Sequence, residues 1–120
     1  AWIIDDTYNG NSQGVAAGLE FLKHSGAKRR VYVTPGLVEQ GSKTIEVHET
    51  IGKQIADAAD VVVLMQNSVT EHILRGLHKA KFKGDISIIE NPLQFYTNLD
   101  QFVAAGDVVL MQNDWTDNYQ

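Results

Sequence analysis

The run Asp60-Val61-Val62-Val63-Leu64-Met65-Gln66-Asn67 decides the fold class of this chain. Its uninterrupted apolar segment, without alternating polar residues, is typical of a strand covered on both faces, as in a parallel sheet. A similar run, Asp107-Val108-Val109-Leu110-Met111-Gln112-Asn113, follows near the end of the chain. Because the similarity does not extend into the flanking residues, we interpret the two runs as central strands with similar surroundings and not as a structural repeat.

Short apolar runs and amphipathic stretches alternate through the remaining sequence. We expect strands at residues 2–4, 31–33, 61–65, 86–89 and 107–111. The first helix begins at Asn11 or Ser12 and the second covers about 43–58. A capping box at 68–71 opens the third. The fourth has Pro92 in its first turn and buries Leu93, Tyr96, Leu99 and Phe102. This order predicts an α/β fold: a Rossmann-like, doubly wound, mainly parallel sheet of five or six strands with helices on both faces.

Composition narrows the possible partners and location. The 120 residues carry a formal net charge of -5 and no cysteine. The acidic excess argues against a nucleic-acid partner and against docking on an anionic membrane, and no apolar run has the length of a membrane span. These properties favour a cytoplasmic protein. Since a strand-like run without methionine stands at the start, we expect residues 1–120 to be a single domain excised from a longer chain.

Polar residues follow every expected strand, at the edge where ligands bind to doubly wound sheets. The densest group is Asp-Asp-Thr-Tyr-Asn-Gly-Asn at residues 5–11, directly before the first helix. A carboxylate at a strand end suits the hydroxyl groups of a ribose, and a helix N-terminus favours a nearby anion. The same residues also suit turns that cap the helix. Their spacing alone leaves both interpretations open.

Several familiar sites have no counterpart in the sequence. There is no G-x-x-x-x-G-K-[ST] phosphate loop, no G-x-G-x-x-G and no G-x-S-x-G. The four histidines lack the spacing of a zinc site on one helix, so we expect no metal ligands in this chain. His48 lies beside the apolar stripe of the second expected helix, which favours a structural role over a catalytic one.

Two segments resemble a known family. Ile3-Ile4-Asp5-Asp6-Thr7-Tyr8-Asn9-Gly10-Asn11 resembles the D-[DN]-[ST]-Y-N-A-N-P pattern that opens the C-terminal domain of Mur ligases of the MurF type. Val33-Thr34-Pro35-Gly36-Leu37-Val38-Glu39-Gln40-Gly41, with His48 and Gly52 downstream, resembles the family's G-x-M-x-E-L-G…H-x-x-x-G segment. The order of strands and helices matches as well.

The resemblance implies an ATP-dependent amide ligase of peptidoglycan precursor synthesis, acting through an acyl phosphate. Its cofactors would be ATP and Mg²⁺, with the metal held mainly by a central domain outside these residues. Its partners would be a UDP-muramoyl peptide, an amino acid or dipeptide amine, and the N-terminal and central domains of the same chain. The motif match assigns Asp6, Tyr8, Asn9 and Asn11 to the nucleotide. It assigns Gly36, Leu37, Glu39, His48, Asn113 and Asp114 to the amine substrate.

Departures from the family pattern keep other functions open. The family's K-G-S-R signature after the last strand is replaced by residues 111–119, and Gly10-Asn11-Ser12 stands where Ala-Asn-Pro is usual. A related Mur-like ligase with a different amine is one alternative. A stand-alone flavodoxin-like or receiver-like binding module is another, and a third is an interaction domain that docks a partner through Trp115 and Tyr119. Lacking a phosphate loop, the isolated chain is expected not to turn over ATP.

Overall fold

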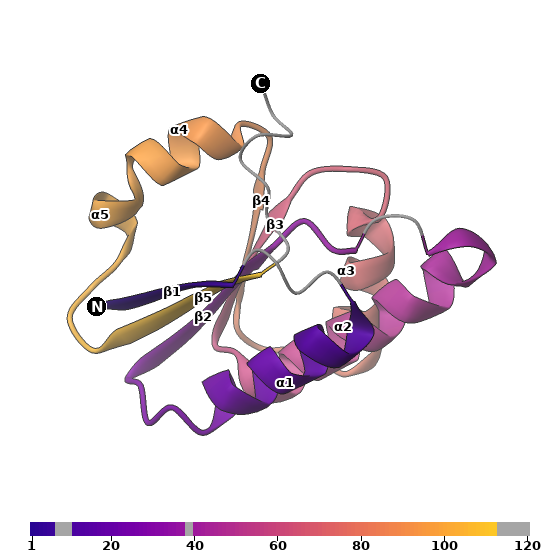
Figure 1. Ribbon diagram of the computed structural model, residues 1–120, viewed down its shortest axis with the longest axis horizontal. Helices are drawn as coiled ribbons and strands as arrows, with labels where there is room; N and C mark the ends of the chain where they lie inside the picture. The colour runs from indigo at the N-terminus through magenta and orange to yellow at the C-terminus, as the bar shows by residue number, and fades with distance from the viewer. Residues whose placement is uncertain (7–10, 38–39, 113–120) are drawn as a thin grey trace.

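The computed structural model describes residues 1–6, 11–37 and 40–112, and these form one layered α/β unit (Figure 1). Five parallel strands make a single sheet in the order β1-β5-β2-β3-β4. They are β1 (Trp2–Asp6), β2 (Arg29–Thr34), β3 (Val61–Met65), β4 (Asp85–Ile89) and β5 (Asp107–Gln112). The predicted strands are all present, and most extend one or two residues beyond the predicted limits.

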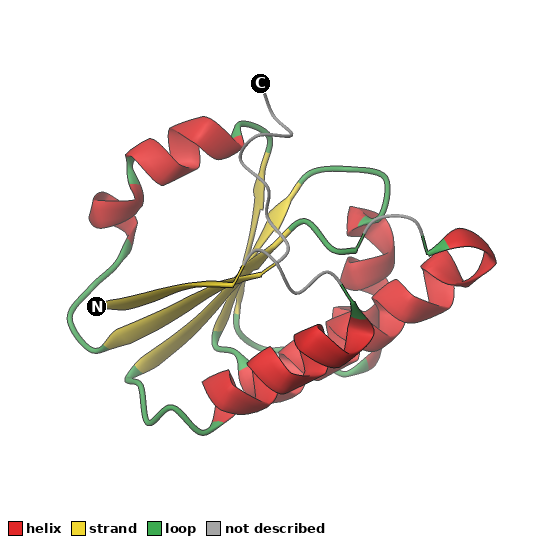
Figure 2. Ribbon diagram, in the orientation of Figure 1, coloured by secondary structure: helices red, strands yellow, loops and turns green. Residues whose placement is uncertain are grey.

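Helices cover both faces of the sheet (Figure 2). On one face lie α1 (Ser12–Lys23), α2 (Thr44–Ala58), preceded by the short 3-10 helix η1 (Gly41–Lys43), and α3 (Thr70–Lys79). On the other lie α4 (Pro92–Thr97) and α5 (Leu99–Phe102). The chain moves across the sheet in one direction from β1 to β4, and the return to β5 places α4 and α5 on the opposite side. The predicted doubly wound architecture is therefore confirmed.

The core has two halves, separated by the sheet. Alternate strand residues such as Tyr32, Val62 and Leu64 pack against α1, α2 and α3. Their neighbours Val63 and Met65, among others, pack against α4 and α5. Every residue of β3 is buried because both faces are covered. This explains the continuous apolar run that predicted the strand.

Helices α2 and α3 approach closely enough for their backbones to touch. A Cβ atom at Gly52 would collide with the carbonyl oxygen of Ile73, and one at Gly76 with that of Glu49. Two glycines therefore let the helices pack without intervening side chains. Gly52 is the glycine of the H-x-x-x-G segment, and its role in this structure is helix packing.

Two details of the predicted helices are wrong. Helix α3 begins at Thr70. Its N-cap residue, Val69, makes no side-chain capping hydrogen bond, so the predicted capping box does not form. Instead, the Asn67 side-chain oxygen accepts a hydrogen bond from the Val69 N–H at 2.8 Å. The last predicted helix is divided at Asn98 into α4 and α5. Leu93 is 43% exposed, and Phe95 packs on the sheet together with the predicted Tyr96, Leu99 and Phe102.

Candidate functional site

One buried amide organises the edge of the sheet where β1 and β5 end. Gln112, the last residue of β5, is fully buried and pairs in register with Asp6. Its Nε2 donates to the Asp6 carboxylate at 2.7 Å and to the Gly14 carbonyl at 3.0 Å. Its Oε1 accepts a hydrogen bond from the Tyr32 hydroxyl at 2.7 Å. This amide thus joins three strands to the first turn of α1.

The surrounding residues leave room for that amide and keep it in one orientation. A Cβ atom at Gly18 would collide with the Gln112 side chain, so glycine at this position lets α1 lie directly over it. Burial raises the pKa of Tyr32 far above its ordinary value, so its hydroxyl stays a neutral donor. A donor facing Oε1 and two acceptors facing Nε2 determine which way the amide points. Asp6 is consequently held beside the start of α1.

Asn11 caps α1, as one of the two interpretations predicted. Its backbone is extended, and its side-chain oxygen accepts a hydrogen bond from the Gly14 N–H at 2.7 Å. The first turn of α1 contains no acidic residue, so no carboxylate of the helix itself opposes an anion there. Tyr8 and Asn9, the other residues assigned to the nucleotide, lie outside the described residues.

A notch in the surface lies beside Asp6. It has a volume of about 340 Å³ and opens between β1 and α1. Its walls are mostly apolar, with two carboxylates at the rim. The lining residues are Ile4, Asp5, Asp6, Gly14, Ala17, Gly18, Phe21 and Leu110.

A second cluster surrounds His48, which packs against the turn that follows β2. The ring is fully buried; Nδ1 lies 2.6 Å from the Thr44 carbonyl oxygen, and Nε2 accepts the Leu37 N–H at 3.0 Å. Since a carbonyl only accepts, these two contacts require a neutral ring that carries its proton on Nδ1. His48 therefore supports the turn through its backbone.

Gly36 shows why this turn needs glycine. Its φ is +94°, and a Cβ atom there would lie 2.8 Å from Val69 and 2.9 Å from the His48 ring. The Thr34 hydroxyl accepts the Gly36 N–H at 3.0 Å. The Asn67 amide donates to the Pro35 carbonyl at 2.7 Å and so ties the end of β3 to the same turn.

The structure thus groups the predicted site residues into two clusters on neighbouring strands. Asp6 and Asn11 belong to the Gln112 cluster, and Gly36, Leu37 and His48 belong to the other. Glu39, Asn113 and Asp114 lie outside the described residues. The sequence prediction missed Gln112, Tyr32 and Asn67. The available signal was weak, since a polar residue follows every strand.

Charged residues at the amino ends of the strands are paired with each other. Arg29 donates to Asp107 at 2.6 Å, and this hydrogen bond holds the pKa of the Asp107 carboxyl below its usual value. Arg30 likewise pairs with Asp60 at 2.9 Å and lowers its pKa. The described ranges contain no group of acidic or histidine side chains that could hold a metal ion. Nor does any helix in them have the length and apolar character needed to cross a membrane.

Comparison with known proteins identifies the family. The sequence model of one family, described as "Mur ligase, glutamate ligase domain", matches residues 1–112. The chain belongs to the Mur ligase family. Among solved structures, this Mur ligase domain is similar to the crystal structure of MurF ligase from Thermotoga maritima in complex with ADP. The two share 27% sequence identity with a TM-score of 0.69, and the match covers 92% of this chain.

The same match covers 24% of the Thermotoga maritima ligase, so this Mur ligase domain spans about a quarter of that protein. No curated protein matches the sequence. The predicted family and fold are both confirmed by these findings.

Proposed function

We propose that residues 1–120 form the C-terminal domain of an ATP-dependent Mur-type amide ligase that extends a UDP-muramoyl peptide in peptidoglycan synthesis. The observation that carries the proposal is the Asp6 carboxylate, held by Gln112 beside the N-terminus of α1. The similar MurF ligase, whose structure contains ADP, supports a nucleotide as a ligand of such a ligase. A cytoplasmic location is part of the proposal, as are the N-terminal and central domains of the same chain.

In this proposal, Asp6 accepts hydrogen bonds from the ribose hydroxyls of ATP. The carboxylate is suited to this role because its donor Gln112 is itself immobilised by Tyr32 and Gly14. Asn11 caps α1, and Tyr8 and Asn9 are proposed to contact the nucleotide. The notch between β1 and α1 provides an apolar wall next to Asp6.

The amine substrate is assigned to Gly36 and Leu37 of the second cluster, with His48 as a positioning residue. Glu39, Asn113 and Asp114, which lie outside the described residues, are proposed to bind it as well. His48 acts through the Leu37 N–H, which it holds at 3.0 Å. Residues 111–119 replace the family's K-G-S-R signature. This difference favours a related ligase whose amine differs from D-alanyl-D-alanine.

The proposed reaction joins a carboxylate to an amine through an acyl phosphate. ATP would supply the phosphoryl group when bound, and Mg²⁺ ligands are expected from a central domain, since the described residues offer no metal cluster. The residues of this chain bind the nucleotide, orient the amine and exclude water on closure. Without a phosphate loop, the 120 residues alone are expected to release no ADP from ATP.

The experiment that tests this function measures ADP binding to the chain by calorimetry. We expect binding that Asp6→Asn weakens at least about tenfold, because a neutral amide accepts hydrogen bonds less strongly than a carboxylate. Asp5→Asn is the matched control, since Asp5 lines the same notch but pairs in register with Met111, whereas the Gln112 amide donates to Asp6. Equal affinities of the two variants would contradict the assignment of Asp6.

The substrate assignment requires a ligase that carries this domain together with its ATP-binding domain. ADP release is followed with Mg-ATP, a UDP-muramoyl tripeptide and a panel of amines that includes D-alanyl-D-alanine. Release with another amine alone would support the related ligase. If no amine causes ADP release, the result would contradict an enzyme function for these substrates and favour a binding module.

A further inference from the structure

The outer edge of β4 carries unused backbone hydrogen-bonding groups. β4 is the last strand of the sheet, next to β3. The Asp85 N–H donates to the Asp60 carbonyl at 3.1 Å, and the Ile89 carbonyl accepts the Gln66 N–H at 2.9 Å. Odd-numbered residues of β4 therefore direct their backbone groups toward β3. Ile86 and Ile88 consequently direct their N–H and C=O groups outward.

The central part of this edge, residues 86–88, carries no charge and no proline. β4 contains no proline, and it continues β3 in unbroken register over residues 85–89. Ile86 and Ile88 pair in register with Val62 and Leu64, and so lie on the face covered by α1, α2 and α3. They remain 44% and 43% exposed. An exposed apolar edge strand of this kind is a template for another strand.

We propose that β4 pairs with β4 of a second copy of this chain, antiparallel about a two-fold axis at Ser87. In this register Ile86 of one copy lies opposite Ile88 of the other. The outward N–H and C=O groups of both residues are then satisfied in each copy. The four isoleucine side chains meet on one face of the joined sheet, and each Ser87 faces its symmetry mate.

Charge supports the antiparallel direction over the parallel one. The segment that enters β4 is basic on balance, with Lys81 and Lys83 against the single carboxylate of Asp85, whereas Glu90 follows its end. An antiparallel pair brings the basic end of each copy to the acidic end of the other, and a parallel pair would bring like charges together. In the proposed register Lys83 lies opposite Asn91, next to Glu90.

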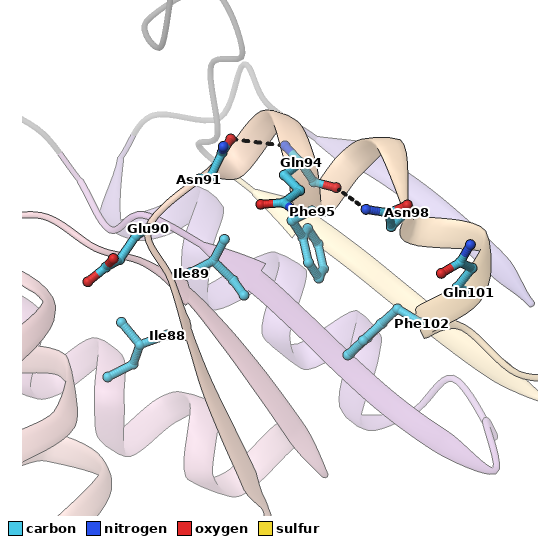
Figure 3. A pocket seen from close by; sticks show the side chains of 9 residues that line it. All are labelled: Ile88, Ile89, Glu90, Asn91, Gln94, Phe95, Asn98, Gln101 and Phe102. Atoms are coloured by element: carbon cyan, nitrogen blue, oxygen red, sulfur yellow. Dashed lines mark hydrogen bonds between the residues drawn. The ribbon is translucent and has the colours of Figure 1, made fainter.

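A groove beside the end of β4 has room for the side chains that the second copy would bring (Figure 3). The groove measures about 720 Å³ and separates β4 from α4 and α5. Gln94 and Gln101 line it, and neither side chain makes a hydrogen bond within the described residues. The proposed register places Asp85 and Lys83 of the second copy alongside this groove, next to these amides.

Disulfide trapping tests the register directly, because the chain has no native cysteine. Ser87→Cys places two thiols across a non-hydrogen-bonded pair, where Cα atoms are about 4.5 Å apart. We expect it to form a covalent dimer under mild oxidation much faster than Ser68→Cys, an exposed control outside the strand. Asp85→Cys, which would face Ile89 rather than itself, should behave like the control. Equal rates for Ser87→Cys and Ser68→Cys would overturn the proposal.

Sedimentation equilibrium over a concentration series tests the association without a covalent bond. The unmodified chain should dimerise, and Ile88→Lys should weaken the dimer at least about tenfold, since it buries like charges at the axis. Ile45→Lys is the matched control, because Ile45 is 51% exposed on α2, away from β4. A monomer at every concentration, or equal loss in both variants, would refute self-pairing.

Discussion

Replacing Gln112 with methionine is the sharpest test of how the Asp6 cluster is built. Methionine keeps nearly the same volume, so it should fill the space beneath Gly18 without creating a cavity. It removes the amide, however, and with it the hydrogen bonds to Tyr32, Asp6 and Gly14. The loss of stability then reports the polar contacts alone.

The magnitude follows from the groups left behind. The Tyr32 hydroxyl is fully buried and would lose its acceptor, at a cost of about 1–3 kcal/mol. The hydrogen bond to the charged Asp6 carboxylate contributes about 1.5–3 kcal/mol. We therefore expect Gln112→Met to lower the free energy of unfolding by about 3–5 kcal/mol. This is a large part of the roughly 5–15 kcal/mol that stabilises a typical domain.

The assay is urea unfolding followed by circular dichroism. Gln66→Met is the matched control, because Gln66 follows β3 in the same sequence context but is exposed; it should change stability by less than about 0.5 kcal/mol. A double-mutant cycle with Tyr32→Phe should give a coupling of about 1–2 kcal/mol, since the phenylalanine no longer needs an acceptor. Equal costs at Gln112 and Gln66, or no coupling to Tyr32, would refute the reasoning.

Three further predictions concern other parts of the fold. Gly76→Ala should destabilise the chain by about 1–3 kcal/mol in urea, since its methyl group collides with the Glu49 carbonyl; an unchanged stability would mean the helices separate freely. Arg29 lowers the folded pKa of Asp107, so this pair should stabilise the fold above about pH 4 and lose its effect as pH falls through the folded pKa. The acid limb of a stability–pH profile should therefore be shallower in Asp107→Asn, and an identical limb would count against the pair. His48→Phe should accelerate hydrogen exchange of the Leu37 amide, whose acceptor it removes; unchanged protection would show that another group holds the turn.

Prediction from sequence succeeded where local and tertiary preferences agree. Asn11 caps α1 as expected, since an asparagine before a helix finds its N–H partner within the next three residues. It failed at Ser68. Asn67 accepts the Val69 N–H instead, and its amide also donates to the carbonyl of Pro35, which follows β2. It also failed at Leu93, which is exposed, whereas Phe95 packs on the sheet. Such competition depends on segments distant in sequence.

The candidate site divides in the same way. The motif resemblance selected Asp6 and Gly36, and the structure places both at the carboxyl edge of the sheet. It offered no means of finding Tyr32, which lies in the middle of a strand, or of seeing that the His48 ring has both nitrogens engaged. These contacts join residues that the chain order separates, so only the packed fold reveals them.

The amino-acid sequence by itself determined the α/β class, the positions of the five described strands and the two-sided burial of β3, because hydrophobic periodicity is a local property of the chain. The order of the strands, and the partner of each polar side chain, were decided only by tertiary structure. Gln66 and Gln112 illustrate the difference, since each ends a similar apolar strand. Gln66 is exposed, whereas Gln112 lies between two other strands and under α1, where burial is tolerated only because Tyr32, Asp6 and Gly14 satisfy its amide.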